Sequence, residues 1–191
     1  MFRIHPECAL WWTVATAGLL LGACNSGADV AVTTAKEEPV LQCGADGFLA
    51  ADLYGAIEAR LDWARDDLEC AGMPRPEGRG VRLRLAGPQQ NGKAELVFII
   101  ALPEFGRDGS AAEFDANVTL IEAGAGRFFS TPDTSNCLVD VTAIRALDTA
   151  GHRYSIAGTL YCIAPLPEIN GDTSVSVPEL RFSGLLDWSA S

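Results

Sequence analysis

The stretch CLVDVTAIRALDTAGHRYSIAGTLYC, residues 137–162, predicts a β-hairpin. Its two ends, residues 137–144 and 154–162, are strand-like, and the turn-prone sequence Asp-Thr-Ala-Gly lies between them. In a hairpin centred in this turn, opposed residue numbers add to 299, as 137 and 162 do. We therefore expect Cys137 and Cys162 to face each other across two neighbouring strands.

Further strand-like segments lie on both sides of this hairpin. Apolar and other residues alternate with a period of two in residues 81–85 and 179–188, and residues 95–101 are more continuously apolar, as in a strand covered on both faces. A second hairpin is expected from residues 117–121 and 127–130, and residues 73–80 and 164–172 have loop-like compositions. Short strands with turns at near-regular spacing predict an all-β fold, an antiparallel β-sandwich or small barrel stapled by disulfides.

Residues 53–69 fit two interpretations. Residues 57–63 alternate strictly, which indicates a strand. Leu53, Ile57, Leu61, Ala64 and Leu68 also share one face at helical spacing. We favour the strand, because Gly55 weakens a helix, and leave the helix open.

The first 23 residues have the length and polarity of a signal peptide, with an apolar run that is too short for a spanning helix. The segment ends in Leu21-Gly22-Ala23-Cys24 and resembles the bacterial lipoprotein signal, in which an aliphatic residue and two small residues precede the lipidated cysteine. The resemblance implies cleavage before Cys24 and a membrane anchor through lipid on Cys24. In lipoproteins with this signal, Asp after the lipidated cysteine favours retention at the inner membrane. Because Asn25 stands there, the resemblance implies the outer membrane rather than the inner one, with the protein facing the periplasm.

The remaining chain is expected to form one domain behind a tether. Residues 24–42 have mixed polar composition and no sustained period, which indicates a lipidated flexible tether. As a coil, a tether of this length spans about 24 Å, enough to hold the domain clear of the lipid headgroups. Residues 43–191 form the predicted β-rich domain, which is large enough for one core.

Four cysteines remain once Cys8 is removed with the signal and Cys24 is acylated. An even number in an exported chain favours disulfides. Because Cys137 and Cys162 face each other, Cys43 and Cys70 are paired by elimination. A metal site made of these cysteines would require closely spaced ligands, which the sequence lacks, so no metal is predicted.

The net charge is −11, which disfavours nucleic acid as a partner. The local basic cluster contains Arg75, Arg79, Arg82 and Arg84. It could bind an anionic lipid headgroup or a polysaccharide, or its members could be outward strand residues paired with nearby acids.

No catalytic set is evident, and we predict neither catalytic residues nor a cofactor. His152 is the single histidine after the signal, and it falls beside the predicted hairpin turn. Residues 66–69 and 170–172 are rich in oxygen ligands but lack the spacing of a calcium loop. Gly124-Ala125-Gly126 is interpreted as a turn rather than a phosphate-binding loop.

Residues 69–76, 117–122 and 126–131 resemble uncharacterised proteobacterial lipoproteins of β structure, and this resemblance implies no activity. The leading hypothesis is a non-enzymatic, lipid-anchored envelope protein that acts as a binding or scaffold module for an unknown ligand or protein partner. One alternative is a carrier that holds a lipid or other hydrophobic ligand in an internal cavity lined by its Phe and Trp side chains. The other is a carboxylate-dependent envelope hydrolase, which requires two facing acids in a cleft.

Overall fold

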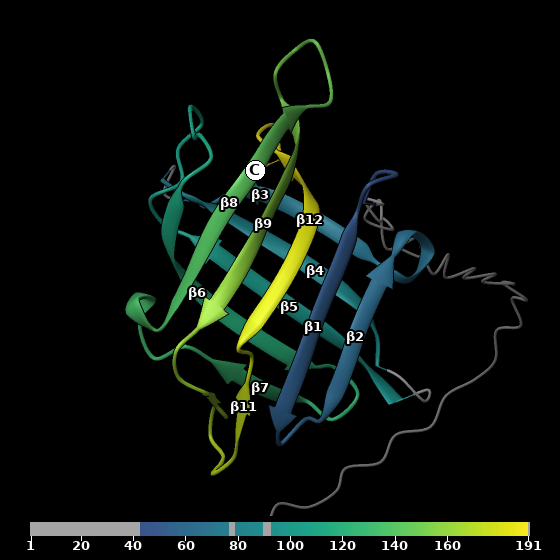
Figure 1. Ribbon diagram of the computed structural model, residues 1–191, viewed down its shortest axis with the longest axis vertical. Helices are drawn as coiled ribbons and strands as arrows, with labels where there is room; N and C mark the ends of the chain where they lie inside the picture. The colour runs from purple at the N-terminus through teal and green to yellow at the C-terminus, as the bar shows by residue number, and fades with distance from the viewer. Residues whose placement is uncertain (1–42, 77–78, 90–92, 191) are drawn as a thin grey trace, which may run out of the picture. The chain divides into compact units, whose positions relative to one another are not determined.

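A computed structural model describes residues 43–76, 79–89 and 93–190 (Figure 1). The predicted signal segment, Cys24 and the predicted tether lie outside the described residues. No helix among the described residues is long and apolar enough to cross a membrane.

The described chain is built from antiparallel strands, which confirms the predicted all-β fold. The strands are β1 (Phe48–Gly55), β2 (Ala59–Ala64), β3 (Glu69–Pro74), β4 (Val81–Gln89), β5 (Lys93–Leu102), β6 (Glu113–Glu122), β7 (Arg127–Ser130), β8 (Cys137–Ala146), β9 (Arg153–Cys162), β10 (Leu166–Pro167), β11 (Ser174–Ser176) and β12 (Glu179–Asp187). Two short 3₁₀ helices, η1 (Arg65–Asp67) and η2 (Thr134–Asn136), connect them. Met73 and Pro74, predicted as loop, end β3, and Leu166–Pro167 of the second predicted loop form β10.

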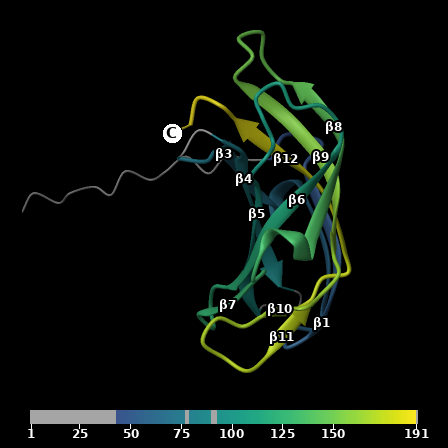
Figure 2. The same ribbon diagram turned by 90° about the vertical axis from the view of Figure 1, so that its left-hand side faces the viewer.

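The strands pack as two layers that share β6. The front layer contains β2, β1, β12, β9, β8 and the first part of β6, and the back layer contains β3, β4, β5, the rest of β6 and β7. Residues 113–116 pair with β8, whereas residues 117–122 pair with β5 or β7, so β6 passes from one layer to the other. The two layers cross steeply in Figure 1 and are seen edge-on in Figure 2.

The hairpin of β8 and β9 has the predicted register over its first half. Cys137 lies opposite Cys162, and the pairing continues to Val141 opposite Gly158. An extra residue at Thr142 then forms a β-bulge and shifts the register by one. Gly151 completes the turn at φ 68°, a left-handed conformation that glycine adopts at little cost. The predicted disulfides Cys137–Cys162 and Cys43–Cys70 are both present.

The ambiguous segment 53–69 is not a single element. The strand interpretation is confirmed for β2, but the first residues of the segment belong to β1, and η1 and the start of β3 follow. The chain reverses at Gly55, where φ is 99° and an added Cβ would lie 2.7 Å from the Ser174 carbonyl oxygen. Glycine is therefore required for the β1–β2 turn, rather than merely weakening a helix.

The space between the layers is filled by large apolar side chains. Phe98, Phe129 and Phe182 are fully buried, and the Trp63 ring of β2 meets Phe98 of β5 edge-on at 6.2 Å between centroids. The Trp63 indole N–H donates to the Pro88 carbonyl oxygen at 2.8 Å. Trp63 thus links the two layers by packing and by a hydrogen bond.

Candidate functional site

A groove of about 440 Å³ lies on the outer face of the front layer, along β1. Leu49, Ala51 and Leu53 of β1 are buried against the core. Since side chains alternate along a strand, Ala50 and the residues at 52 and 54 project outward. The outward side of β1 is therefore the floor of the groove, and β2 and β12 form its walls.

The groove exists because Ala50 is small and its cross-strand neighbours are long. Ala50 lies opposite Asp62 of β2 on one side and Arg181 of β12 on the other. Adjacent strands are about 4.8 Å apart, so the two charged residues are separated by roughly 9.6 Å at their Cα atoms. An acidic and a basic side chain thus face each other across a methyl group.

At Asp52, the next outward residue of β1, the neighbour on β2 is basic rather than acidic. The Arg60 guanidinium of β2 donates to the Asp52 carboxylate at 2.8 Å, and this hydrogen bond and ion pair raise the pKa of Arg60. On the opposite wall, Glu179 lies 3.9 Å from Arg181. The rest of the lining comes from Ala51, Tyr54, Leu61 and Pro178. The groove therefore offers both signs of charge and one aromatic ring.

The four arginines predicted as an anion site lie on the back layer or the turn beside it, on strands other than those of the groove. Arg84 of β4 bridges two carboxylates, Glu69 of β3 at 3.1 Å and Glu95 of β5 at 3.3 Å. Arg82 donates to the Met73 sulfur, Arg75 donates its backbone N–H to the Gly80 carbonyl oxygen, and Arg79 is exposed. Arg84 thus fits the interpretation of an outward strand residue paired with acids, and anion binding at the cluster stays a prediction.

The other sequence candidates occupy turns and loops. His152 is exposed beside the β8–β9 turn, and its Nδ1 lies 3.5 Å from Arg107. Gly124-Ala125-Gly126 forms the predicted turn between β6 and β7, with Gly126 at φ 64°. Asp66, Asp67 and Glu69 line a shallow hollow of about 300 Å³ together with Glu95. Within the described residues, no group of three or more His, Cys, Asp or Glu side chains could hold a metal ion.

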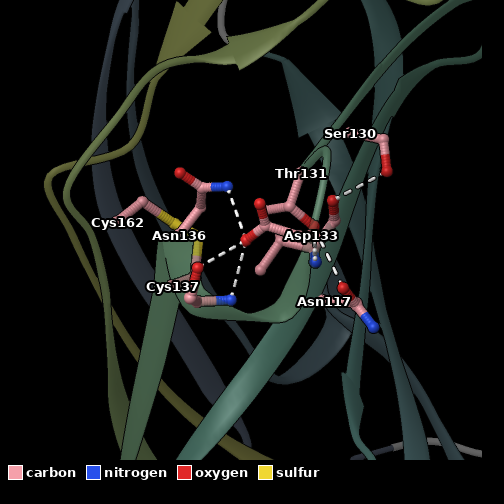
Figure 3. Close-up of a disulfide and its surroundings, with 9 residues drawn as sticks. Asn117, Ser130, Thr131, Asp133, Asn136, Cys137 and Cys162 are labelled. Carbon is pink, nitrogen blue, oxygen red and sulfur yellow. Dashed lines mark hydrogen bonds between the residues drawn. A yellow bond between two sulfur atoms is a disulfide. The ribbon is translucent and has the colours of Figure 1, made fainter.

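A polar cluster beside the Cys137–Cys162 disulfide holds the turn into β8 (Figure 3). The Asp133 carboxylate accepts hydrogen bonds from the Ser135 N–H at 2.9 Å, the Ser135 hydroxyl at 2.6 Å and the Asn136 side-chain amide at 3.0 Å. The bond from the Ser135 backbone N–H caps η2, and the bonds from the Ser135 hydroxyl and N–H lower the pKa of Asp133. Asp133 acts here as a structural cap.

Two further carboxylates cap turns in the same manner. Asp148 accepts from the backbone N–H groups of His152 and Arg153, each at 3.1 Å, and Asp187 accepts from Ser189. These hydrogen bonds lower the pKa of both groups from the ordinary value of 3.8. Because the unfolded chain then binds protons more readily, the stabilisation is present above pH 3.8 and is lost as the pH falls through the lowered value.

We expect Asp148→Asn to lower the free energy of unfolding at neutral pH and to differ much less from wild type well below pH 3.8. Urea unfolding at the two pH values measures this difference. Asp172→Asn is the control, because Asp172 is exposed in the β10–β11 loop and its replacement should have little effect at either pH. A loss for Asp148→Asn that is equal at both pH values would contradict the capping role.

Sequence reasoning missed the groove, although it carries a weak local signal. Leu49, Ala51 and Leu53 are apolar at every second position, as on the inward face of a strand, but Ala50 between them is apolar too, so the alternation is incomplete. The walls come from β2 and from β12, which is more than a hundred residues farther along the chain. Only the strand pairing shows that Ala50 lies between Asp62 and Arg181.

Comparison with protein-family models, with curated proteins and with solved structures yields no match for this chain. The candidate site therefore depends on its own geometry alone.

Proposed function

We propose that this protein is a non-enzymatic binding module of the cell envelope, anchored by lipid on Cys24 and facing the periplasm from the outer membrane. The observation that carries the binding role is the groove along β1, which displays Asp62, Arg181 and Tyr54 around the small side chain of Ala50. Its volume of about 440 Å³ lies within the range of small-molecule sites, roughly 300–1,000 Å³. Rigid strands form the floor and both walls, which favours a preformed site.

The charges in the groove support binding rather than catalysis. The Asp52 carboxylate is engaged with the Arg60 guanidinium at 2.8 Å, which is a structural ion pair across two neighbouring strands. Asp133, Asp148 and Asp187, whose pKa values are lowered by hydrogen bonds, cap turns outside the groove. No observation favours the envelope hydrolase as a second function.

The carrier hypothesis requires an open space between the layers. Phe98, Phe105, Phe129 and Phe182 lie in that interior and are buried. The groove is on the opposite, solvent-facing side of the front layer and is lined mainly by polar side chains. The packing and the lining therefore support a polar ligand at the surface.

The anchor is tested by replacing Cys24. Wild-type protein should fractionate with the outer membrane, and Cys24→Ala protein should be released, because no acyl chain can be attached without the thiol. Separation of the membranes, with mass analysis of the N-terminal peptide, measures both properties. Cys24→Ala protein that is folded and still fractionates with the membrane would contradict lipid anchoring.

The binding role is tested by filling the groove. Threonine is favourable in strands, so Ala50→Thr should fold while adding bulk to the groove floor. Native mass spectrometry of the full chain, purified in detergent from its own envelope, should find a retained ligand on wild type and little on Ala50→Thr. Ala157→Thr is the matched control, because Ala157 is also half-buried and outward-facing, on β9 away from the groove. Equal ligand content in all three proteins, or none in wild type, would overturn the proposed role of the groove.

A further inference from the structure

The arrangement of charges in the groove selects among ligand types. At the level of Ala50, the acid is on the β2 wall and the base on the β12 wall. At the level of Asp52, the base Arg60 is on the β2 wall, and the acid Glu179 lies at the start of β12 on the other wall. A simple anion would meet three carboxylates, and a simple cation would meet two guanidinium groups. A ligand that carries both signs can place each charge against its complement.

The Ala50 level is the one with room for such a ligand. At the other level, Asp52 is already bonded to Arg60 at 2.8 Å and occupies the floor between the walls. At the Ala50 level, the contact of Arg181 with Glu179 is long, at 3.9 Å, and the Arg181 side chain is 62% exposed. The Arg181 guanidinium can therefore direct its in-plane fork of N–H donors to a ligand carboxylate, for which that geometry is suited.

We propose that the groove binds a small zwitterion that carries a primary ammonium group and a carboxylate, with the ammonium at Asp62 and the carboxylate at Arg181. This inference rests on the proposed binding function and specifies its ligand class. A dipeptide spans at most about 7 Å, which is shorter than the roughly 9.6 Å between the Cα atoms of the two walls. It therefore fits between side chains that extend from both walls. The same chemistry is present in a free dipeptide and at the ends of a slightly longer peptide.

The test uses dialanine and three blocked forms, N-acetylated, C-amidated and blocked at both ends, titrated onto the full chain in detergent and followed by chemical shifts of β1, β2 and β12. Wild type should bind either singly blocked form about threefold to tenfold more weakly than dialanine, because each form lacks one charge. Asp62→Asn should abolish only the preference for the ammonium. Arg181→Gln should abolish only the preference for the carboxylate.

A matched control lies among the residues that pair across the front layer at the level of Ala50 and Arg181. Asp140 of β8 is separated from Arg181 by Thr159, as Asp62 is separated from it by Ala50. Asp140 is outside the groove, so Asp140→Asn should retain both preferences. Trialanine with unblocked ends distinguishes a free dipeptide from a slightly longer peptide as the source of the two charges. Binding equal to that of dialanine indicates that longer peptides are also accepted, and weaker binding indicates a dipeptide.

Two results would overturn the inference. One is equal binding of all four dialanine forms, or no binding of any, to wild type. The other is that the control variant Asp140→Asn loses both preferences to the same extent as Asp62→Asn and Arg181→Gln lose theirs. If either result is obtained while Ala50→Thr still loses the ligand found by native mass spectrometry, the proposed ligand class is wrong and the binding function stands. If Ala50→Thr changes neither measurement, the proposed function fails as well.

Discussion

Replacement of Phe98 by alanine should lower the free energy of unfolding by about 3–5 kcal/mol. Phe98 is fully buried at the centre of β5, and its ring meets Trp63 of the opposite layer edge-on. The truncation removes buried apolar surface and leaves a cavity between two sheets whose backbones are held by their own hydrogen bonds. The cavity can therefore collapse only in part. Urea unfolding followed by far-UV circular dichroism measures the loss.

Phe128→Ala is the matched control for this prediction. Phe128 has the same side chain and lies in the same layer, on β7, but it is 43% exposed. Its truncation should cost about 1 kcal/mol or less, since surface substitutions leave no cavity. A loss for Phe128→Ala equal to that for Phe98→Ala would show that interlayer packing does not dominate the stability of the domain.

Removal of the Cys137–Cys162 disulfide should destabilise the domain by about 3.5 kcal/mol, on the chain-entropy account of the loop that it closes. The two cysteines are 25 residues apart and lie opposite each other at the end of the β8–β9 hairpin, where β8 also begins to pair with β6. Without the bond, the unfolded chain regains the freedom of this loop. The double replacement Cys137→Ala with Cys162→Ala should show the loss in urea unfolding under oxidising conditions.

The second disulfide provides a comparison at nearly equal loop length. Cys43 and Cys70 are 27 residues apart, so replacing both by alanine should cost about the same on the entropic account. This bond joins Cys43, which precedes β1, to Cys70 of β3 rather than two neighbours in a hairpin. A loss that is large for one pair and negligible for the other would show that native-state packing, and not loop entropy, determines the contribution of each bond.

Hairpin pairing was predictable because it depends on neighbours in the chain. The turn at 148–151 and the alternation on both sides of it placed Cys137 opposite Cys162, and the structure confirms this register as far as Val141. The bulge at Thr142 was not predictable, because a bulge accommodates the bend of a sheet around its core, and no local pattern encodes that bend. The β1–β2 turn was missed for a related reason: Gly55 was interpreted only as a residue that weakens a helix, and its need for glycine comes from the close approach of the Ser174 carbonyl oxygen, which is far along the chain.

The sequence by itself determined the all-β class, most of the long alternating strands and both disulfides. These depend on periodicity, on the count of cysteines and on short-range turns, which are all local properties. The expectations for Cys24, the tether and the membrane also come from sequence, and they stay predictions. Tertiary structure alone decided the groove, because Ala50 becomes a floor only when β2 and β12 pair on either side of β1. Cross-strand neighbours are chosen by long-range burial of inward faces, so the chemistry of an outward face cannot be read from any one strand.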